Sequence, residues 1–436
     1  MNSSDVRQKY VNFFISRRHK LVPSSSLVPE NDPTTLFTGS GMQPMIQYLL
    51  GAEHPLGKRT VDSQKCFRSQ DIEEVGDNRH TTFFEMLGNW SFGNYFKEEQ
   101  LNWFFEFLTD KNEGLGLDPN KIYVSAFEGN SQIPKDEETI EIWQELFGKK
   151  NIDAKIDQRI YLYGVEKNWW SRAGTPEQMP EGEPGGPDSE VFYLFEEIKH
   201  DPSFGEKCHP NCDCGRFLEI GNSVFMQYQK QANGFNELPQ KNVDFGGGLE
   251  RLTAAVNNEP DIFKNDLHWG VIKELANDLN ISYEENPKTT STFRIVADHL
   301  KAATFLIKDG VIPSNKQQGY ILRRLLRRAA VKLEVLQQGS MEILPELVDE
   351  VVNIYQNTEY FAQTDSKNIA QVIKDEIKKF ENTLSKGLKE IDKIEKINGK
   401  IAFDLYQSFG FPLEITNELF AEKGQQINKI EFELSF

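Results

Sequence analysis

The sequence predicts an α+β protein in which a domain built on a sheet is followed by a mainly helical domain. Three strand candidates lie in the first part of the chain, at residues 34–38, 81–86 and 224–228. From Glu259 onward, apolar residues recur mostly at three- and four-residue spacing, which is typical of helices. No GxGxxG pattern follows a first strand, and strands do not alternate regularly with helices. A doubly wound parallel sheet is therefore disfavoured.

The first part of the chain also contains helix and loop signals. A helix capped by Ser4 or Asp5 is expected at the N-terminus, because apolar residues follow at near-helical spacing. Residues 101–108 are expected to form an aromatic-rich core helix. Residues 174–188, which contain many glycines and prolines, are expected to form a loop.

The second part of the chain contains one long helical pattern, at residues 369–394. Apolar residues at three- and four-residue spacing favour a helix of a bundle over a dimerising coiled coil. The boundary between the two parts is expected near Pro260. The predicted domains are residues 1–257 and residues 258–436.

Composition fits an ordinary globular protein, with 436 residues, 38% hydrophobic and 11% aromatic residues. No run of eighteen apolar residues is present, so no membrane span is expected. The polar N-terminus lacks the apolar core of a signal peptide. These features predict a cytoplasmic location.

The charge of the chain is distributed unevenly. The net charge of −18 disfavours a polyanionic partner, but residues 294–332 contain nine Lys/Arg against two acids, a local net charge of +7. Within 322–329, four arginines stand at i, i+1, i+4 and i+5 and are expected to share one helix face, with leucines facing inward. A solvated helix face is the usual explanation of such a pattern, and a nucleic-acid-binding face is the alternative.

Two arginines, an aromatic strand and three glycines form a pattern suited to ATP. Arg68 and Arg251 can each clamp a phosphate. The strand near residues 79–89 offers an aromatic face for adenine, and the glycines of residues 246–248 allow close backbone approach at a helix start.

In combination, these residues resemble the signature elements of the class II aminoacyl-tRNA synthetases. The amino-acid sequence of residues 82–96 narrows the resemblance to the alanyl-tRNA synthetase family. The resemblance covers nearly the whole chain, including residues 24–29, 31–34, 294–299, 319–324 and 410–412. It implies an antiparallel sheet flanked by helices and then a helical domain that recognises the tRNA acceptor stem.

The resemblance implies an activation site that uses ATP with Mg²⁺ and alanine. Arg68 would grip the α-phosphate, Arg251 would reach the far phosphates or cover the adenine, and Phe84, or else Phe83, would stack on it. The other implied nucleotide contacts are Asp71, Arg79, Met86, Gly246 and Gly248. Asp244 would hold the alanine ammonium, in a pocket lined by Trp170, Asn222 and Val224.

On the tRNA side, the resemblance assigns Arg323, Arg324, Arg327 and Arg328 to the acceptor stem. Asp298 and Arg327 would lie near the unpaired base beside the CCA end. Asn315 and Gln407 would read the G·U wobble pair.

The chain departs from the family pattern at three places. A Gly-Gly-Lys-His stretch is missing after Arg68, so the lysine expected to touch ATP has no counterpart. Gly221 replaces a tryptophan, which implies a reshaped pocket wall. Gln407 replaces an aspartate, so a neutral amide stands where an acceptor-only carboxylate is usual.

Three of the four cysteines lie within residues 208–214 and predict a local metal site in a reducing compartment. Cys208, Cys212 and Cys214 with His209 could hold a structural Zn²⁺, with His200 as the alternative fourth ligand. Reduced thiols without a metal are the other explanation. The cluster is expected to brace residues 219–228.

The expected function is that of an alanine–tRNA ligase, monomeric and without editing or C-terminal domains. One alternative is a silent RNA-binding or regulatory paralogue, which the retained Arg68, Asp244 and Arg251 disfavour. Another is an enzyme that transfers a small amino acid to a non-tRNA acceptor. The arginine helix and Asn315 favour tRNA instead.

Overall fold

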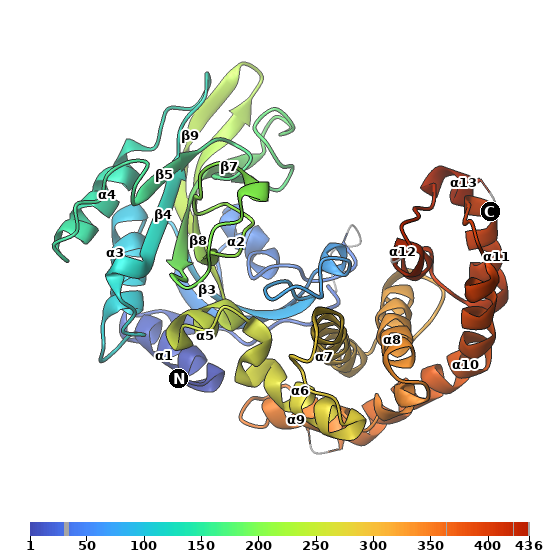
Figure 1. The fold of residues 1–436 in the computed structure, drawn as a ribbon. Helices are drawn as coiled ribbons and strands as arrows, with labels where there is room; N and C mark the ends of the chain where they lie inside the picture. Colours follow the sequence, from blue (N-terminus) through green and yellow to red (C-terminus); the bar gives the residue numbers. More distant parts are fainter. Residues whose placement is uncertain (30–34, 363, 422, 435–436) are drawn as a thin grey trace. The chain divides into compact units, whose positions relative to one another are not determined.

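The computed structural model describes residues 1–29, 35–362, 364–421 and 423–434 (Figure 1). The chain divides into two compact units. The first comprises Met1–Ser26, Thr38–Cys66 and Phe84–Asn265, and the second comprises Leu27–Phe37, Phe67–Phe83 and Asp266–Phe436. The division of function between residues 1–257 and 258–436 stays a prediction.

A nine-stranded sheet, counted over the described residues, forms the centre of the first unit. Its strands are β1 (Lys20–Leu21), β2 (Arg59–Phe67), β3 (Phe83–Phe92), β4 (Ile122–Phe127), β5 (Ile160–Tyr163), β6 (Trp169–Ser171), β7 (Pro184–Leu194), β8 (Phe217–Gln231) and β9 (Gly234–Gly248). Their order is β1-β2-β3-β9-β8-β7-β4-β5, and β6 pairs with β7. The pairs β3–β9, β9–β8, β8–β7 and β7–β4 are antiparallel, whereas β1–β2 and β4–β5 are parallel. The expected α+β class with a largely antiparallel sheet is confirmed.

The helices of the unit are α1 (Ser3–Ser16), α2 (Ile46–Leu49), α3 (Lys97–Thr109), α4 (Glu137–Gly148) and α5 (Leu249–Asn257). Helices α1, α3 and α4 cover one face of this sheet (Figure 1). The ring of Phe104 in α3 lies 4.4 Å from that of Phe245 in β9, and Tyr10 of α1 lies 6.1 Å from the same ring. Because side chains alternate along a strand, Asp244 and Gly246 point to the opposite face. The short α2 lies on that face, where Leu49 packs with Trp90 and Val224, and the candidate site lies beside it.

The structure corrects several local predictions. Residues 35–38 form no strand, and residues 31–34 of the family pattern lie outside the described residues. The loop expected over residues 174–188 ends early, because β7 begins at Pro184. The cap of α1 is Asn2, whose Oδ1 accepts from the Asp5 amide at 2.8 Å. The strand predicted at 81–86 is confirmed from Phe83 onward in β3, and the strand at 224–228 and the helix at 101–108 are confirmed within β8 and α3.

The second unit is helical in its long C-terminal part. Its helices are α6 (Asp266–Leu279), α7 (Pro287–Lys308), α8 (Gln317–Leu336), α9 (Val348–Ile354), α10 (Asp365–Lys393), α11 (Gly399–Phe409), α12 (Leu413–Ala421) and α13 (Lys429–Glu433). The predicted long helix is confirmed as α10, with Ile373, Phe380 and Leu384 fully buried. This helix packs on α7, α8, α9 and α11, as a bundle helix does. No helix of the described residues has the length and apolar character needed to cross a membrane.

Candidate functional site

The candidate site of the first unit lies on the face of β3, β8 and β9 opposite helices α1, α3 and α4. In the register of these strands, Asp244 stands opposite both Trp90 and Val224, and Gly246 stands opposite Asn222. Directly opposed residues of antiparallel strands project to the same face. Strand pairing therefore brings Asn222, Val224 and Asp244 together, as the sequence predicts.

Asp244 is a buried carboxylate with one strong donor. The indole Nε1 of Trp90 donates to its Oδ1 at 2.5 Å, and only 7% of the residue is exposed. Burial raises the pKa of Asp244 to about 7, and the Trp90 hydrogen bond offsets part of the rise. A buried carboxylate with a raised pKa lacks a counter-charge, which an ammonium group would supply.

A second buried carboxylate, Asp62 of β2, was not predicted. It is 1% exposed, and burial followed by the charge of Asp244 raises its pKa well above the ordinary range. Its Oδ1 is buried without a hydrogen-bond partner among the described residues. No strand was predicted around residue 62, so nothing in the sequence indicated that this aspartate is buried in the sheet.

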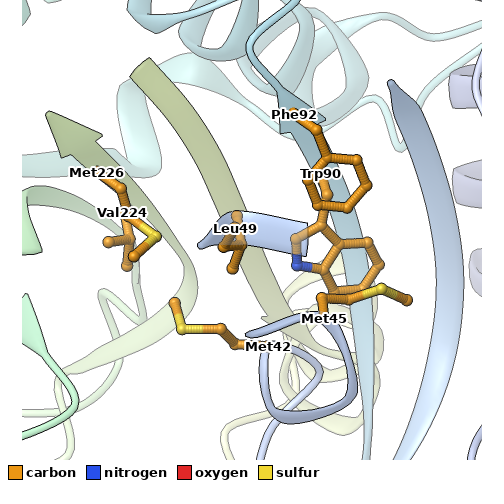
Figure 2. Close-up of a cluster of buried hydrophobic side chains, with 7 residues drawn as sticks. All are labelled: Met42, Met45, Leu49, Trp90, Phe92, Val224 and Met226. Atoms are coloured by element: carbon orange, nitrogen blue, oxygen red, sulfur yellow. The ribbon is translucent and has the colours of Figure 1, made fainter. Parts of the chain in front are cut away.

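Trp90 and Val224, the two residues opposite Asp244, belong to an apolar cluster (Figure 2). It comprises Met42, Met45, Leu49, Trp90, Phe92, Val224 and Met226, and Trp170 packs against it half-buried. Gly88 is needed here, because a Cβ at that position would lie 2.2 Å from the Trp90 ring. An anion beside a small apolar wall suits a small amino acid with an ammonium and a methyl group.

Gly221 faces away from this pocket, contrary to the prediction that it reshapes the pocket wall. A Cβ at Gly221 would lie 2.6 Å from the ring of Phe104 and 2.9 Å from that of Phe245. Both rings belong to the core on the helical face of the sheet. Because Asn222 and Val224 project to the other face, the glycine at 221 alters core packing instead of the pocket.

Three carboxylates lie at the edge of the same site: Asp188 and Glu190 of β7 and Glu219 of β8. Burial raises the pKa of Asp188 and of Glu190, and the charge of Glu219 adds to both rises. Such a set of oxygen donors with excess negative charge fits a hard divalent cation such as Mg²⁺. These residues could hold the Mg²⁺ of the nucleotide, and the sequence did not predict them.

Arg251 is hydrogen-bonded to Glu219, one of these three carboxylates. Its Nη1 donates to Glu219 Oε2 at 2.9 Å and to the Glu219 carbonyl oxygen at 3.3 Å. Gly248, three residues earlier, is the N-cap of α5, and a Cβ at Gly246 would lie 2.8 Å from the sulfur of Met86. Met86 and Gly246, both predicted to contact ATP, are thus neighbours.

The remaining residues predicted to bind ATP fall in both units. Arg68, Asp71 and Arg79 belong to the Phe67–Phe83 stretch of the second unit, and Phe84 begins the next stretch of the first. The suggestion that Phe83 stacks on adenine is wrong. Phe83 is fully buried, and its ring stacks on that of Phe305 at 4.0 Å with 13° between the planes. Phe84 is only half-buried and remains the candidate for stacking on adenine.

In the second unit, the four arginines of α8 do not form the expected single exposed face. Arg324 is 8% exposed and Arg328 is 4% exposed. Arg323 and Arg327 share Glu376 of α10, each with a nitrogen 2.9 Å from its Oε1. The helical spacing of the arginines could not predict their pairing with Glu376, because Glu376 lies about fifty residues away in the sequence.

The carboxylate partners of the two buried arginines come from other segments. Arg324 pairs with Glu73 and lies 3.8 Å from Glu414, and Arg328 donates to Glu418 at 2.6 Å. The arginine face expected from the sequence is therefore largely neutralised by carboxylates.

The residues predicted to read the acceptor stem have different surroundings. Asp298 is fully buried and accepts hydrogen bonds from Thr82, so a direct contact with a tRNA base is wrong for it in this structure. Asn315 and Gln407 are exposed, and Asn315 accepts a hydrogen bond from Arg323. Arg327 also donates to the carbonyl oxygen of Gly410 at 2.7 Å, near Gln407 in the chain.

The cysteine cluster of the first unit has the geometry of a metal site. One ligand atom each from His200, Cys208, Cys212 and Cys214 lies within 4.8 Å of the others. The Cys208–Cys214 sulfur pair and the Cys212 Sγ–His200 Nδ1 pair are each separated by 3.7 Å. A tetrahedron with zinc–sulfur bonds of about 2.3 Å has edges of about 3.8 Å, so the donors present fit Zn²⁺.

His209, the first candidate for the fourth ligand, is not part of this group. Its Nδ1 lies 2.9 Å from the hydroxyl oxygen of Tyr163. The imidazole within reach of the three thiols is that of His200, which fits the fourth ligand position.

Comparisons with known proteins support the resemblance found in the sequence. The family described as tRNA synthetases class II (A) matches residues 5–436. An alanine–tRNA ligase of Borreliella afzelii is 42% identical and one of Treponema denticola 40% identical, each aligned with 99% of this chain and 71% of the relative. A ligase of the same name from Petrotoga mobilis is 38% identical over 99% of this chain and 47% of its own length. The chain therefore belongs to the class II tRNA synthetases, in the family of the alanine–tRNA ligases.

Proposed function

We propose that the chain is an alanine–tRNA ligase, which activates alanine with ATP and transfers it to the 3′ end of alanine tRNA. The observation that carries the proposal is Asp244, a buried carboxylate beside the apolar wall of Trp90 and Val224. An ammonium placed there meets its counter-charge, and a methyl group meets apolar side chains.

In the activation step, the alanine carboxylate attacks the α-phosphorus and displaces pyrophosphate. The protein contributes mainly position and charge. Asp244 orients alanine through its ammonium, and Arg68 neutralises the charge that develops at the α-phosphate. Arg251 and Phe84 hold the far phosphates and the adenine. Mg²⁺ bound to Glu219 and its neighbouring carboxylates would neutralise phosphate charge.

In the transfer step, the second unit would bind the acceptor stem. Asn315 and Gln407 are exposed and can hydrogen-bond in a shallow groove. Arg323 and Arg327 supply partly exposed guanidinium groups for phosphates. Residues 258–436 are thus proposed to recognise tRNA and residues 1–257 to activate alanine. None of the four cysteines forms a disulfide, as expected in a reducing compartment such as the cytoplasm.

The proposal is tested by alanine-dependent exchange of pyrophosphate into ATP, followed by charging of total tRNA. The chain should catalyse both, with alanine preferred over other amino acids. Asp153→Asn is the matched control for substitutions of Asp244, since the Asp153 side chain is 77% exposed in the same unit. Absence of alanine-dependent exchange in the purified chain would refute the proposal. Exchange without charging would instead favour a non-tRNA acceptor.

We further propose that His200, Cys208, Cys212 and Cys214 bind a structural Zn²⁺. Between two of these ligands, Asn211 donates to Glu190 Oε2 at 3.0 Å, so a metal would brace the carboxylate edge of the site. His200→Gln should lower the zinc content and melting temperature, whereas His209→Gln should keep the metal. Loss of zinc only in the His209 variant would reverse the ligand assignment. Zinc-free protein with unchanged stability would contradict a structural metal.

A further inference from the structure

The Phe67–Phe83 segment, which connects β2 to β3, is held at both ends by side chains of α7 and α8. At one end, Asp298 of α7 accepts from the Thr82 amide at 2.8 Å and from the Thr82 hydroxyl at 2.6 Å. At the other, Arg328 of α8 donates to the carbonyl oxygen of Ile72 at 2.6 Å and to that of Val75 at 3.4 Å. All these residues belong to the same compact unit.

His299 links the two ends through a buried chain of hydrogen bonds. Its Nδ1 lies 2.9 Å from Asp298 Oδ2, and its Nε2 lies 2.9 Å from Arg328 Nη1. Because a guanidinium can only donate, Nε2 must accept and Nδ1 must donate to the aspartate. Asp298 and His299 are fully buried, so solvent cannot replace a hydrogen-bond partner that this network loses.

Further contacts hold the middle of the segment. Arg324 of α8 pairs with Glu73, and Arg294 of α7 donates to the Gly76 carbonyl oxygen at 3.3 Å. Gly76 has φ +137°, and a Cβ there would lie 2.6 Å from the hydroxyl oxygen of Ser291. The backbone therefore approaches α7 as closely as only glycine allows.

The segment has little regular structure of its own. It contains the 3₁₀ turn Ser69–Asp71, and the Arg68 amide bonds the Thr82 carbonyl oxygen at 2.9 Å. Between Arg68 and Arg79 it holds four acids and no lysine. Within the segment, Asp77 pairs with Arg79 and His80, whereas Glu73 takes its cationic partner, Arg324, from α8.

The arginines of α8 form two stripes with different partners. Residues four apart on a helix share a stripe, so Arg324 and Arg328 form one and Arg323 and Arg327 form the other. The first stripe holds the Phe67–Phe83 segment. The second pairs with Glu376 of α10.

We propose that Arg324, Arg328 and Asp298 are positioning residues for amino-acid activation, which hold the segment that carries Arg68 and Arg79. This inference rests on the proposed function, in which Arg68 binds the α-phosphate. A misplacement of about 1 Å in a group that positions a substrate can cost about a hundredfold in rate. The stripe of Arg324 and Arg328 thus serves ATP, although it lies on the helix assigned to tRNA.

Glu73→Gln is the principal test, because the Glu73 side chain is 47% exposed and its loss should leave the fold intact. In exchange assays without tRNA, Glu73→Gln and Arg324→Gln should each raise KM for ATP about three- to tenfold, the range of one ordinary hydrogen bond, because the pair positions the segment and does not itself touch ATP. KM for alanine should stay within about twofold of its wild-type value. Lys308→Gln is the control, since it removes the 2.6 Å ion pair with Asp365 on the same unit without touching the segment.

Arg328 is tested by rescue and by hydrogen exchange. Arg328→Lys should retain more ATP affinity than Arg328→Met, because the lysine still donates to one of the two carbonyl groups. Amide hydrogen exchange over residues 69–80 should accelerate in Glu73→Gln at an unchanged melting temperature, and in Arg328→Lys by more than the fall in melting temperature accounts for. Unchanged exchange and unchanged KM for ATP in an active enzyme, with tRNA charging alone reduced, would overturn the inference. An inactive wild-type chain would instead refute the proposed function.

Discussion

The indole Nε1 of Trp90 donates a hydrogen bond to Oδ1 of Asp244 across a distance of 2.5 Å. The two residues are directly opposed in β3 and β9, so sheet pairing itself sets this contact. It leaves Asp244 Oδ2 as the oxygen available to an ammonium group. The carboxylate is thereby oriented before alanine binds.

Replacement of Asp244 by asparagine should raise KM for alanine about ten- to a hundredfold, the cost of one charged hydrogen bond. KM for ATP should change little, because the carboxylate faces the ammonium. Steady-state pyrophosphate exchange measures both constants. Asp153→Asn should change neither, and an effect of Asp244→Asn confined to ATP would show that the residue has another role.

The raised pKa of Asp244 predicts a pH dependence of alanine use. Only the ionised carboxylate attracts the ammonium, so kcat/KM for alanine should rise as pH increases through about 7. The neighbouring acids Asp62, Asp188 and Glu190 also have raised pKa values and broaden the profile. A flat profile between about pH 6 and 8 would contradict the expected titration.

Stability should show the opposite trend. Between the ordinary pKa of 3.8 and about 7, folded Asp244 keeps a proton that the unfolded chain has released. The stability from this group is therefore fully present below pH 3.8 and is lost as pH rises through about 7. The free energy of unfolding of the wild type, relative to Asp244→Asn, should fall by about 4 kcal/mol across this window, because each pH unit contributes about 1.4 kcal/mol. Parallel curves for the two proteins would rule out the shift.

Replacement of Arg68 by alanine should slow alanine activation about a hundredfold to a thousandfold and leave the melting temperature nearly unchanged. It removes one preorganised donor to the charge that develops at the α-phosphate. Single-turnover formation of the adenylate is the measurement. Arg172→Ala, at an arginine whose side chain is 62% exposed, serves as the control. Near-normal adenylate formation in Arg68→Ala would refute the assignment.

The double change Arg323→Gln with Arg327→Gln should destabilise the fold as well as weaken tRNA charging. It leaves Glu376, whose side chain is 2% exposed, without its two cationic partners. Adding Glu376→Gln should restore most of the melting temperature while charging stays weak. The salt dependence of tRNA binding should also become flatter in this triple variant. If the triple variant recovered tRNA charging as well as stability, Arg323 and Arg327 would have a purely structural role.

Gln407→Asp should sharpen the preference for a G·U pair in the acceptor stem. The pair leaves a guanine amino group free in the minor groove, and a carboxylate accepts from it more strongly than an amide oxygen, by about 1–2 kcal/mol. Charging kinetics on G·U and G·C variants of alanine tRNA measure the difference. Asp404→Asn on the same helix is the control. No change in selectivity would place Gln407 away from the pair.

The sequence by itself determined which residues share a face of the sheet or a stripe of a helix. Asn222 and Val224 are two positions apart on a strand, and the long pattern at 369–394 has a helical period. Both periodicities follow from backbone geometry alone, so the site strands and α10 could be predicted. The resemblance added the roles of Asp244, Arg68 and Arg251.

Only the tertiary structure decided which charges meet. Glu376 lies 53 residues from Arg323, and Asp298 lies 216 residues from Thr82. Pairing over such separations leaves no local periodicity in the sequence. From the sequence alone, the four arginines therefore predict one exposed face. The structure shows that carboxylates of α10 and α12 pair with them. Burial, which depends on those distant segments, turned Asp298, Arg324 and Arg328 from predicted tRNA contacts into partners of the Phe67–Phe83 segment.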